Sequence, residues 1–196
     1  MKYFLPFLIV LLTWSCDSGS TNQADQLFDN GDYAKAVKEY SSQLENDPSN
    51  VSLLYNRGRA YEELGELNLA EADFVKVTEL DERNLSAFLS LSKVSYEKEA
   101  YNKAVIFADK AIELNENSAQ AHFLGARAKH QLGYVDGAME SYTLAININR
   151  DFGEAYLYRG ALKIHAGKTK SACTDIRKAL NLNVEEAKAV QKKYCN

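Results

Sequence analysis

The three histidines are the side chains of this sequence best suited to binding a metal: His122, His130 and His165. Two ligands on one helix face are normally three or four positions apart, whereas His122 and His130 are separated by two full helical turns. No pattern of cysteines or carboxylates completes a zinc site around them. The sequence therefore predicts no metal site.

A short motif, Gly167-Lys168-Thr169, resembles the end of a phosphate-binding loop. Such a loop has another glycine five positions before its last glycine and follows a strand, but that position is Leu162 and the surrounding pattern is helical. No nucleophile is convincingly placed beside a base. The prediction is a non-enzymatic protein without catalytic residues, cofactor or small-molecule substrate. The alternative to a non-enzymatic protein is an enzyme with an unrecognised site. A deep polar pocket with converging titratable groups would support that alternative.

The composition is that of a folded, mildly acidic protein. The 196 residues include 23 Lys and Arg and 27 Asp and Glu, a formal charge of −4, and 46% are hydrophobic. This apolar fraction is enough for a core, and the acidic balance argues against nucleic acid as a partner. The segment 153–196 carries 9 Lys and Arg and 4 Asp and Glu, a net charge of +5. This basic end is either a solvated cap or a contact for an acidic partner or anionic headgroups.

The N-terminal segment 1–15 differs from the rest of the chain. One lysine precedes a short apolar run, too short to span a bilayer as a helix, which is the pattern of a signal peptide. The run ends in Thr13-Trp14-Ser15-Cys16 and resembles a bacterial lipoprotein signal, which implies that Cys16 is acylated and becomes the N-terminus. Thr13 and Trp14 depart from that pattern, which usually has Leu and a small residue there. The alternative is an ordinary signal peptide with an incidental Cys16.

In the remainder of the chain, the same residue types recur every 34 positions. Within the second unit, Leu54, Gly58 and Tyr61 share one helix face, Gly65 ends that helix, and a second helix follows. Gly58 on the first helix and Ala70 on the second are small enough to let the two backbones approach closely. The most regular marker of the period is alanine, at Ala36, Ala70, Ala104, Ala138 and Ala172.

This pattern of paired helices, with about 34 residues in each unit, resembles the tetratricopeptide repeat. The resemblance implies an all-α fold, a right-handed superhelical solenoid of five helix-turn-helix repeats plus a C-terminal capping helix. The predicted organisation is a signal peptide (1–15), a lipidated cysteine and tether (16–22), a repeat domain (23–186) and a capping helix (187–196). The five units are 17–50, 51–84, 85–118, 119–152 and 153–186.

The two remaining cysteines lie on the last two predicted helices. With a turn near Asn183 and Val184, Cys173 precedes the turn by about as many positions as Cys195 follows it. At about 1.5 Å rise per residue, the two lie level on antiparallel neighbours. An exported protein meets oxidising conditions, so we predict a Cys173–Cys195 disulfide. Two independent buried thiols are the alternative.

In tetratricopeptide proteins the first helices line a concave groove, and the resemblance implies which positions face it. Arg59, Lys93 and Arg127 recur once in each of three successive units and predict a basic row beside apolar anchors, a surface suited to a peptide with acidic residues. A merely solvated helix face is the alternative. The predicted groove residues are Tyr55, Asn56, Arg59, Leu89, Lys93, Tyr96, Phe123, Arg127 and His130.

The sequence thus predicts a membrane-tethered scaffold or adaptor that binds a protein or peptide in its groove. Its expected location is the bacterial cell envelope, on a lipid anchor and outside the cytoplasm. The alternative is a structural accessory subunit of an envelope assembly or secretion complex, which would bind through edges and convex surfaces instead.

Overall fold

The computed structural model describes residues 19–195, and the regular structure in this part of the chain is entirely helical. The predicted signal peptide and Cys16 lie outside the described residues. Each repeat unit contributes a first and a second helix, and one short helix follows the last unit. The first helices are α1 (Gly19–Asp29), α3 (Val51–Glu63), α5 (Leu85–Glu97), α7 (Ala119–Gln131) and α9 (Gly153–His165). The second helices are α2 (Tyr33–Asn46), α4 (Leu67–Leu80), α6 (Tyr101–Leu114), α8 (Val135–Ile148) and α10 (Thr169–Asn181), and α11 (Ala187–Tyr194) ends the series.

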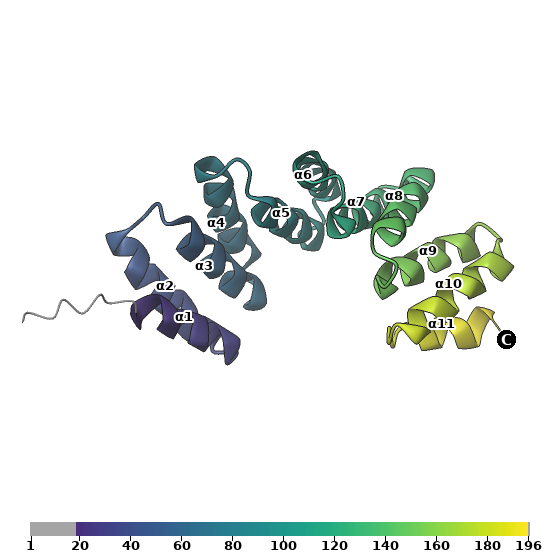
Figure 1. Cartoon of the computed structure of the whole chain (residues 1–196), viewed down its shortest axis with the longest axis horizontal. Coiled ribbons are helices and arrows are strands. Elements are labelled where there is room, and N and C mark those ends of the chain that lie inside the picture. The colour runs from purple at the N-terminus through teal and green to yellow at the C-terminus, as the bar shows by residue number, and fades with distance from the viewer. Residues whose placement is uncertain (1–18, 196) are drawn as a thin grey trace, which may run out of the picture.

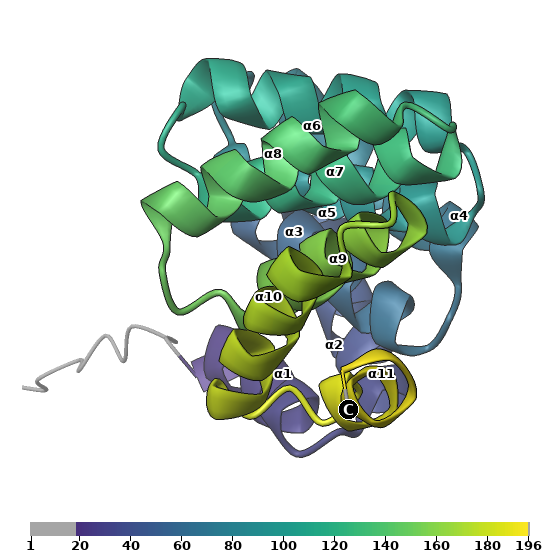
Figure 2. The same cartoon turned by 90° about the vertical axis from the view of Figure 1, so that its right-hand side faces the viewer.

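The helix pairs follow one another in chain order along the long axis of the molecule, from α1 and α2 at one end to α9, α10 and α11 at the other (Figure 1). Seen along that axis, successive pairs are rotated relative to each other (Figure 2). Each unit therefore packs mainly on its neighbours, as in a solenoid. No helix within residues 19–195 is long and apolar enough to cross a membrane.

The first helices begin at a repeated capping residue. The side chains of Asn50, Asn84 and Ser118, at the same position of three successive units, each accept a hydrogen bond from a backbone N–H in the first turn, at 3.1, 3.0 and 3.2 Å. Such caps satisfy a donor that the helix itself leaves free. The chain thus starts α3, α5 and α7 at equivalent positions.

Two largely buried ion pairs join the two helices of a unit, and the arginine of each pair also contacts the unit before it. Arg57 donates to both carboxylate oxygens of Asp73, at 2.8 and 2.7 Å, and also to Ser41 of the preceding unit. Three units later, Arg159 repeats this geometry with Asp175 and Thr143. Each guanidinium therefore links the two helices of its own unit and also links that unit to the preceding one.

The turn inside each unit needs a residue with positive φ. Gly31, Gly65, Gly133 and Gly167 provide it in four units, with φ between 71° and 80°. In the third unit the equivalent residue is Glu99, with φ of 58°. The left-handed conformation costs a residue with a Cβ atom about 1–2 kcal/mol, so the third turn is locally strained.

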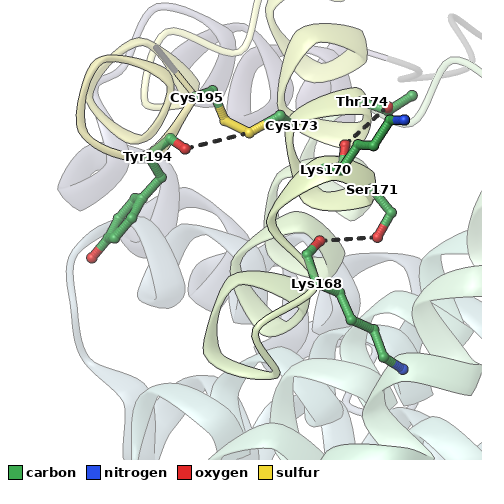
Figure 3. Close-up of a disulfide and its surroundings, with 7 residues drawn as sticks. All are labelled: Lys168, Lys170, Ser171, Cys173, Thr174, Tyr194 and Cys195. Atoms are coloured by element: carbon green, nitrogen blue, oxygen red, sulfur yellow. Dashed lines mark hydrogen bonds between the residues drawn. A yellow bond between two sulfur atoms is a disulfide. The ribbon is translucent and has the colours of Figure 1, made fainter.

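The last unit is closed by α11 and a disulfide (Figure 3). Cys173 of α10 is bonded to Cys195, with a Cα–Cα distance of 5.4 Å. The capping helix begins at Ala187, after a turn that includes Asn183, whose φ is 62°. The two cysteines are level, as the sequence predicts, because α10 leads into that turn and α11 runs back from it.

Replacing Glu99 by glycine should stabilise the protein. We expect Glu99→Gly to raise the free energy of unfolding by about 0.5–1 kcal/mol, because relief of the left-handed strain exceeds the added entropy of the unfolded chain. Urea denaturation followed by circular dichroism measures this change. Glu99→Ala is the matched control, since it removes the same carboxylate but keeps the Cβ atom. Equal stability of the two variants would contradict the strain.

Reduction of the disulfide should loosen the C-terminal end first. For a closed loop with a sequence separation of 22, the chain-entropy relation gives about 3 kcal/mol of stabilisation. We expect a reductant to accelerate amide hydrogen exchange in α11 before it affects α5 or α7. A Cys173→Ala/Cys195→Ala variant should exchange equally with and without reductant. Unchanged protection of α11 after complete reduction would show that packing alone holds the cap.

Candidate functional site

A concave pocket of about 270 Å³ lies between three successive first helices, α3, α5 and α7. It contains four of the predicted groove residues: Tyr55, Arg59, Leu89 and Lys93. The other lining residues are Glu62, Glu63, Ser86, Ser90, Gln120 and Leu124. The pocket therefore combines apolar surface with charges of both signs.

Leu124 was missed at the sequence level, although a signal for it exists. It lies one repeat after Ser90 and two repeats after Asn56, so it occupies the same repeat position as a predicted groove residue. Its side chain is 4% exposed and forms part of the buried apolar wall of the pocket on the α7 side. Repeat position alone could have identified it.

The predicted basic row is not a row of free cations. Each cation contacts a side chain at an equivalent position of the preceding first helix. Arg59 lies over the ring of Phe28 at 4.4 Å, and Arg127 lies over the ring of Tyr96 at 4.1 Å. Lys93 instead forms an ion pair with Glu62. The repeat thus places each cation against the same position of the preceding first helix. Only the residue at that position differs: Phe28, Glu62 or Tyr96.

Acidic side chains share this face with the cations. Partial burial raises the pKa of Glu97 above its usual value, an effect that nearby Lys93 opposes and the Glu62 carboxylate reinforces. These groups must therefore lie close enough to influence one another. The central part of the groove is mixed in charge rather than basic.

Phe123 and Tyr96 are not the exposed aromatic side chains that a groove anchor requires. Phe123 is only 3% exposed and packs against Tyr142, Phe152 and Tyr158, with ring centroids 5.9, 4.7 and 5.7 Å away. It contributes to the core because its ring reaches from α7 to Tyr142 of α8, to Tyr158 of α9 and to Phe152, which precedes α9. Tyr96 is half-buried and supports Arg127 rather than standing free.

Asn56 and His130 belong to separate pockets. Asn56 donates to Asp25 at 3.2 Å, and Tyr40 donates to the same carboxylate oxygen at 2.6 Å. Burial raises the pKa of Tyr40, and the hydrogen bond to Asp25 adds to the effect. These residues line a polar pocket of about 250 Å³ with Phe28, Asp29 and Arg59.

His130 and His165 line an apolar pocket of about 310 Å³ between α7 and α9. Burial lowers the pKa of His130, and the charge of nearby His165 lowers it further. Within residues 19–195, no three or more histidine, cysteine, aspartate or glutamate side chains are grouped so that they could hold a metal ion. The two histidines therefore share one apolar pocket, in which His130 is half-buried and His165 is exposed.

Sequence comparison identifies the repeats. The profile described as "TPR repeat" matches residues 24–65, and the profile of the tetratricopeptide repeat matches residues 51–84 and 119–152. The protein therefore contains tetratricopeptide repeats, which are scaffolds for protein–protein interaction.

Solved structures show the same fold. MamA is 28% identical, with a TM-score of 0.74 over 84% of this chain and 96% of that one. A tetratricopeptide repeat protein from Parabacteroides merdae is 25% identical, with a TM-score of 0.72 over 82% of this chain and 63% of that one. YrrB, a TPR protein with an unusual peptide-binding site, is 22% identical, with a TM-score of 0.69 over 88% and 89%. The predicted fold class, an all-α tetratricopeptide solenoid, is confirmed.

Proposed function

We propose that this protein binds a segment of a partner protein in the concave groove of its repeats. The observation that carries the proposal is the pocket shared by α3, α5 and α7, where Tyr55 and Leu89 offer apolar contacts beside Arg59 and Lys93. A partner side chain seated among these residues would lose water on several sides, which favours a binding hot spot. YrrB provides a precedent for a peptide-binding site on this fold.

We further propose that the protein is tethered by a lipid on Cys16 to a membrane of the bacterial cell envelope, facing away from the cytoplasm. The support is the leader sequence that ends at Cys16. A disulfide between Cys173 and Cys195 agrees with an oxidising location, since disulfides seldom persist in the cytosol. Several acyl chains would make a stable anchor without a spanning helix.

The alternative role, an accessory subunit that binds through its outer surface, has one observation in its favour. The second helices carry exposed apolar side chains, among them Ile106 at 58% exposure, Leu69 at 47% and Leu144 at 40%. Scattered exposed apolar residues are normal on a soluble surface. They nevertheless provide positions at which binding to the outer surface can be compared with binding in the groove.

Site-specific photo-crosslinking distinguishes these two roles. A photoreactive amino acid at Leu89 in the groove should capture a partner in intact cells, and the same amino acid at Ile106 on α6 should not. Both positions carry apolar side chains on helices, so they are matched in chemistry. Capture from Ile106 alone would exclude the groove and favour the accessory subunit.

The lipid anchor is tested by Cys16→Ser. Wild-type protein grown with an alkyne-labelled fatty acid should carry the label and sediment with membranes, because the thiol of Cys16 is the acceptor. Cys16→Ser should lose both properties. A Cys173→Ala/Cys195→Ala variant controls for thiols elsewhere and should keep the label. Equal labelling of Cys16→Ser and wild type would refute the anchor.

A further inference from the structure

The three groove cations differ in how their charges are balanced. Lys93 is paired with Glu62. Arg59 is exposed and shares a pocket with the carboxylates of Asp25 and Asp29. Arg127 forms no hydrogen bond or ion pair with any residue between 19 and 195. Arg59 also forms no hydrogen bond or ion pair there, but it is exposed to solvent, whereas Arg127 is half-buried among aromatic rings.

Aromatic rings hold the guanidinium of Arg127 in place. Its Cζ atom lies 4.1 Å from the ring centroid of Tyr96, 5.7 Å from that of Tyr158 and 5.9 Å from that of Phe123. Contacts of this kind attract the cation to the ring faces but leave its N–H groups unpaired. The side chain is half-buried and positioned before any partner arrives.

The main platform is itself fixed. Gln131 donates a hydrogen bond to the hydroxyl of Tyr96 at 3.0 Å, and Tyr101 packs edge-on against the same ring, with centroids 5.3 Å apart. A platform braced from two sides lowers the entropy that binding would otherwise cost. Arg127 thus differs from a freely moving surface arginine.

The donors of Arg127 lack an acceptor within the described residues. Its Nε atom is buried and has no hydrogen-bond partner there. The two terminal nitrogens also have no hydrogen-bond partner there, but they are not buried, so their donors are open to an acceptor from outside. A planar guanidinium with open donors is suited to a carboxylate, which can accept two parallel hydrogen bonds.

Glu97 does not supply that carboxylate. Its charge and that of Arg127 influence each other, yet the two side chains form no ion pair between residues 19 and 195. Glu97 instead lies among Lys93, Glu62 and Glu63, which are the other charges that act on it. An acceptor for Arg127 must therefore come from a group other than the side chains between residues 19 and 195.

We propose that Arg127, held on Tyr96, Tyr158 and Phe123, is the receptor for a carboxylate of the partner segment that binds in the groove. This inference rests on the proposed function. The carboxylate is either an Asp or Glu side chain or the C-terminal carboxylate of the segment. Arg127 lies one helical turn from Leu124, which lines the pocket of α3, α5 and α7, so a segment seated in that pocket can reach Arg127 with an acidic residue.

Selection from a random-peptide library tests the proposal on the purified full chain. Peptides that bind wild type should be enriched in Asp and Glu or depend on a free C-terminus. Each selected peptide is then resynthesised with Glu→Gln or Asp→Asn and, separately, as a C-terminal amide. One of these changes should weaken binding to wild type roughly 10- to 100-fold, as expected for loss of a charge-assisted hydrogen bond. The change that does so identifies the source of the carboxylate.

Variants of Arg127 show whether that residue is the receptor. Arg127→Met should bind the original peptides as weakly as wild type binds the neutral ones, with no further loss on neutralisation. Arg127→Lys keeps the charge without the planar fork and should give an intermediate loss. Arg177→Met, an exposed arginine on α10, is the matched control and should bind like wild type. Urea denaturation of every variant identifies any loss that is due to unfolding, and the intermediate affinity of Arg127→Lys then decides the question.

The outcomes separate this inference from the proposed function. Peptides that lose binding in Leu89→Gln, but bind equally well after neutralisation or in Arg127→Met, would overturn the receptor and leave the groove in place. Peptides that are insensitive to Leu89→Gln, or the absence of any binding peptide, would overturn both.

Discussion

Close contact between the two helices of a unit depends on a very small side chain at one repeat position. Gly58, Ser92, Ala126 and Gly160 occupy it in four successive units. A Cβ atom at Gly58 would lie 2.7 Å from the ring of Phe74, and one at Gly160 would lie 2.8 Å from Ile176, both of which are fully buried. Where the residue is larger, it is accommodated: Ser92 is buried and donates its hydroxyl to the carbonyl of Ala104 at 2.9 Å. Overpacking would cost about 1–3 kcal/mol, so the spacing of the two helices is tightly constrained in the units that contain Gly58 and Gly160.

This constraint explains why the groove has regular internal contacts. Because each pair of helices keeps the same spacing, consecutive first helices meet in the same register, and equivalent positions of neighbouring units lie side by side. The contacts Arg59–Phe28, Lys93–Glu62 and Arg127–Tyr96 all follow from that register. The fold determines which positions touch, whereas the local sequence determines whether a cation finds a ring or a carboxylate there. The charge pattern of the groove is therefore a property of neighbouring pairs rather than of single residues.

The sequence predicted the fold well because its evidence is periodic. Small residues, turn glycines and alanines recur at fixed offsets, and each has a direct steric meaning. The Cys173–Cys195 pairing could also be predicted from regular geometry, because the rise per residue of two antiparallel helices places both cysteines at the same level. The groove was harder to predict. Periodicity indicates which face a residue occupies, but the burial of Phe123 depends on Tyr142, Phe152 and Tyr158 from other helices. Likewise, the pairing of Lys93 with Glu62 depends on two long side chains that reach across a helix interface, which a single-helix pattern cannot show.

The two ends of the solenoid face a problem that the middle does not. An internal unit is covered on both sides, whereas the last one would expose the apolar face that contains Ile176 and Ala179. The helix α11 covers that face, but it is the shortest helix of the described chain and has one buried side chain, Ala187. A helix this short is marginal by itself in water, so its packing needs support. A covalent bond to Cys173 provides this support, because it removes the freedom of α11 to detach from α10.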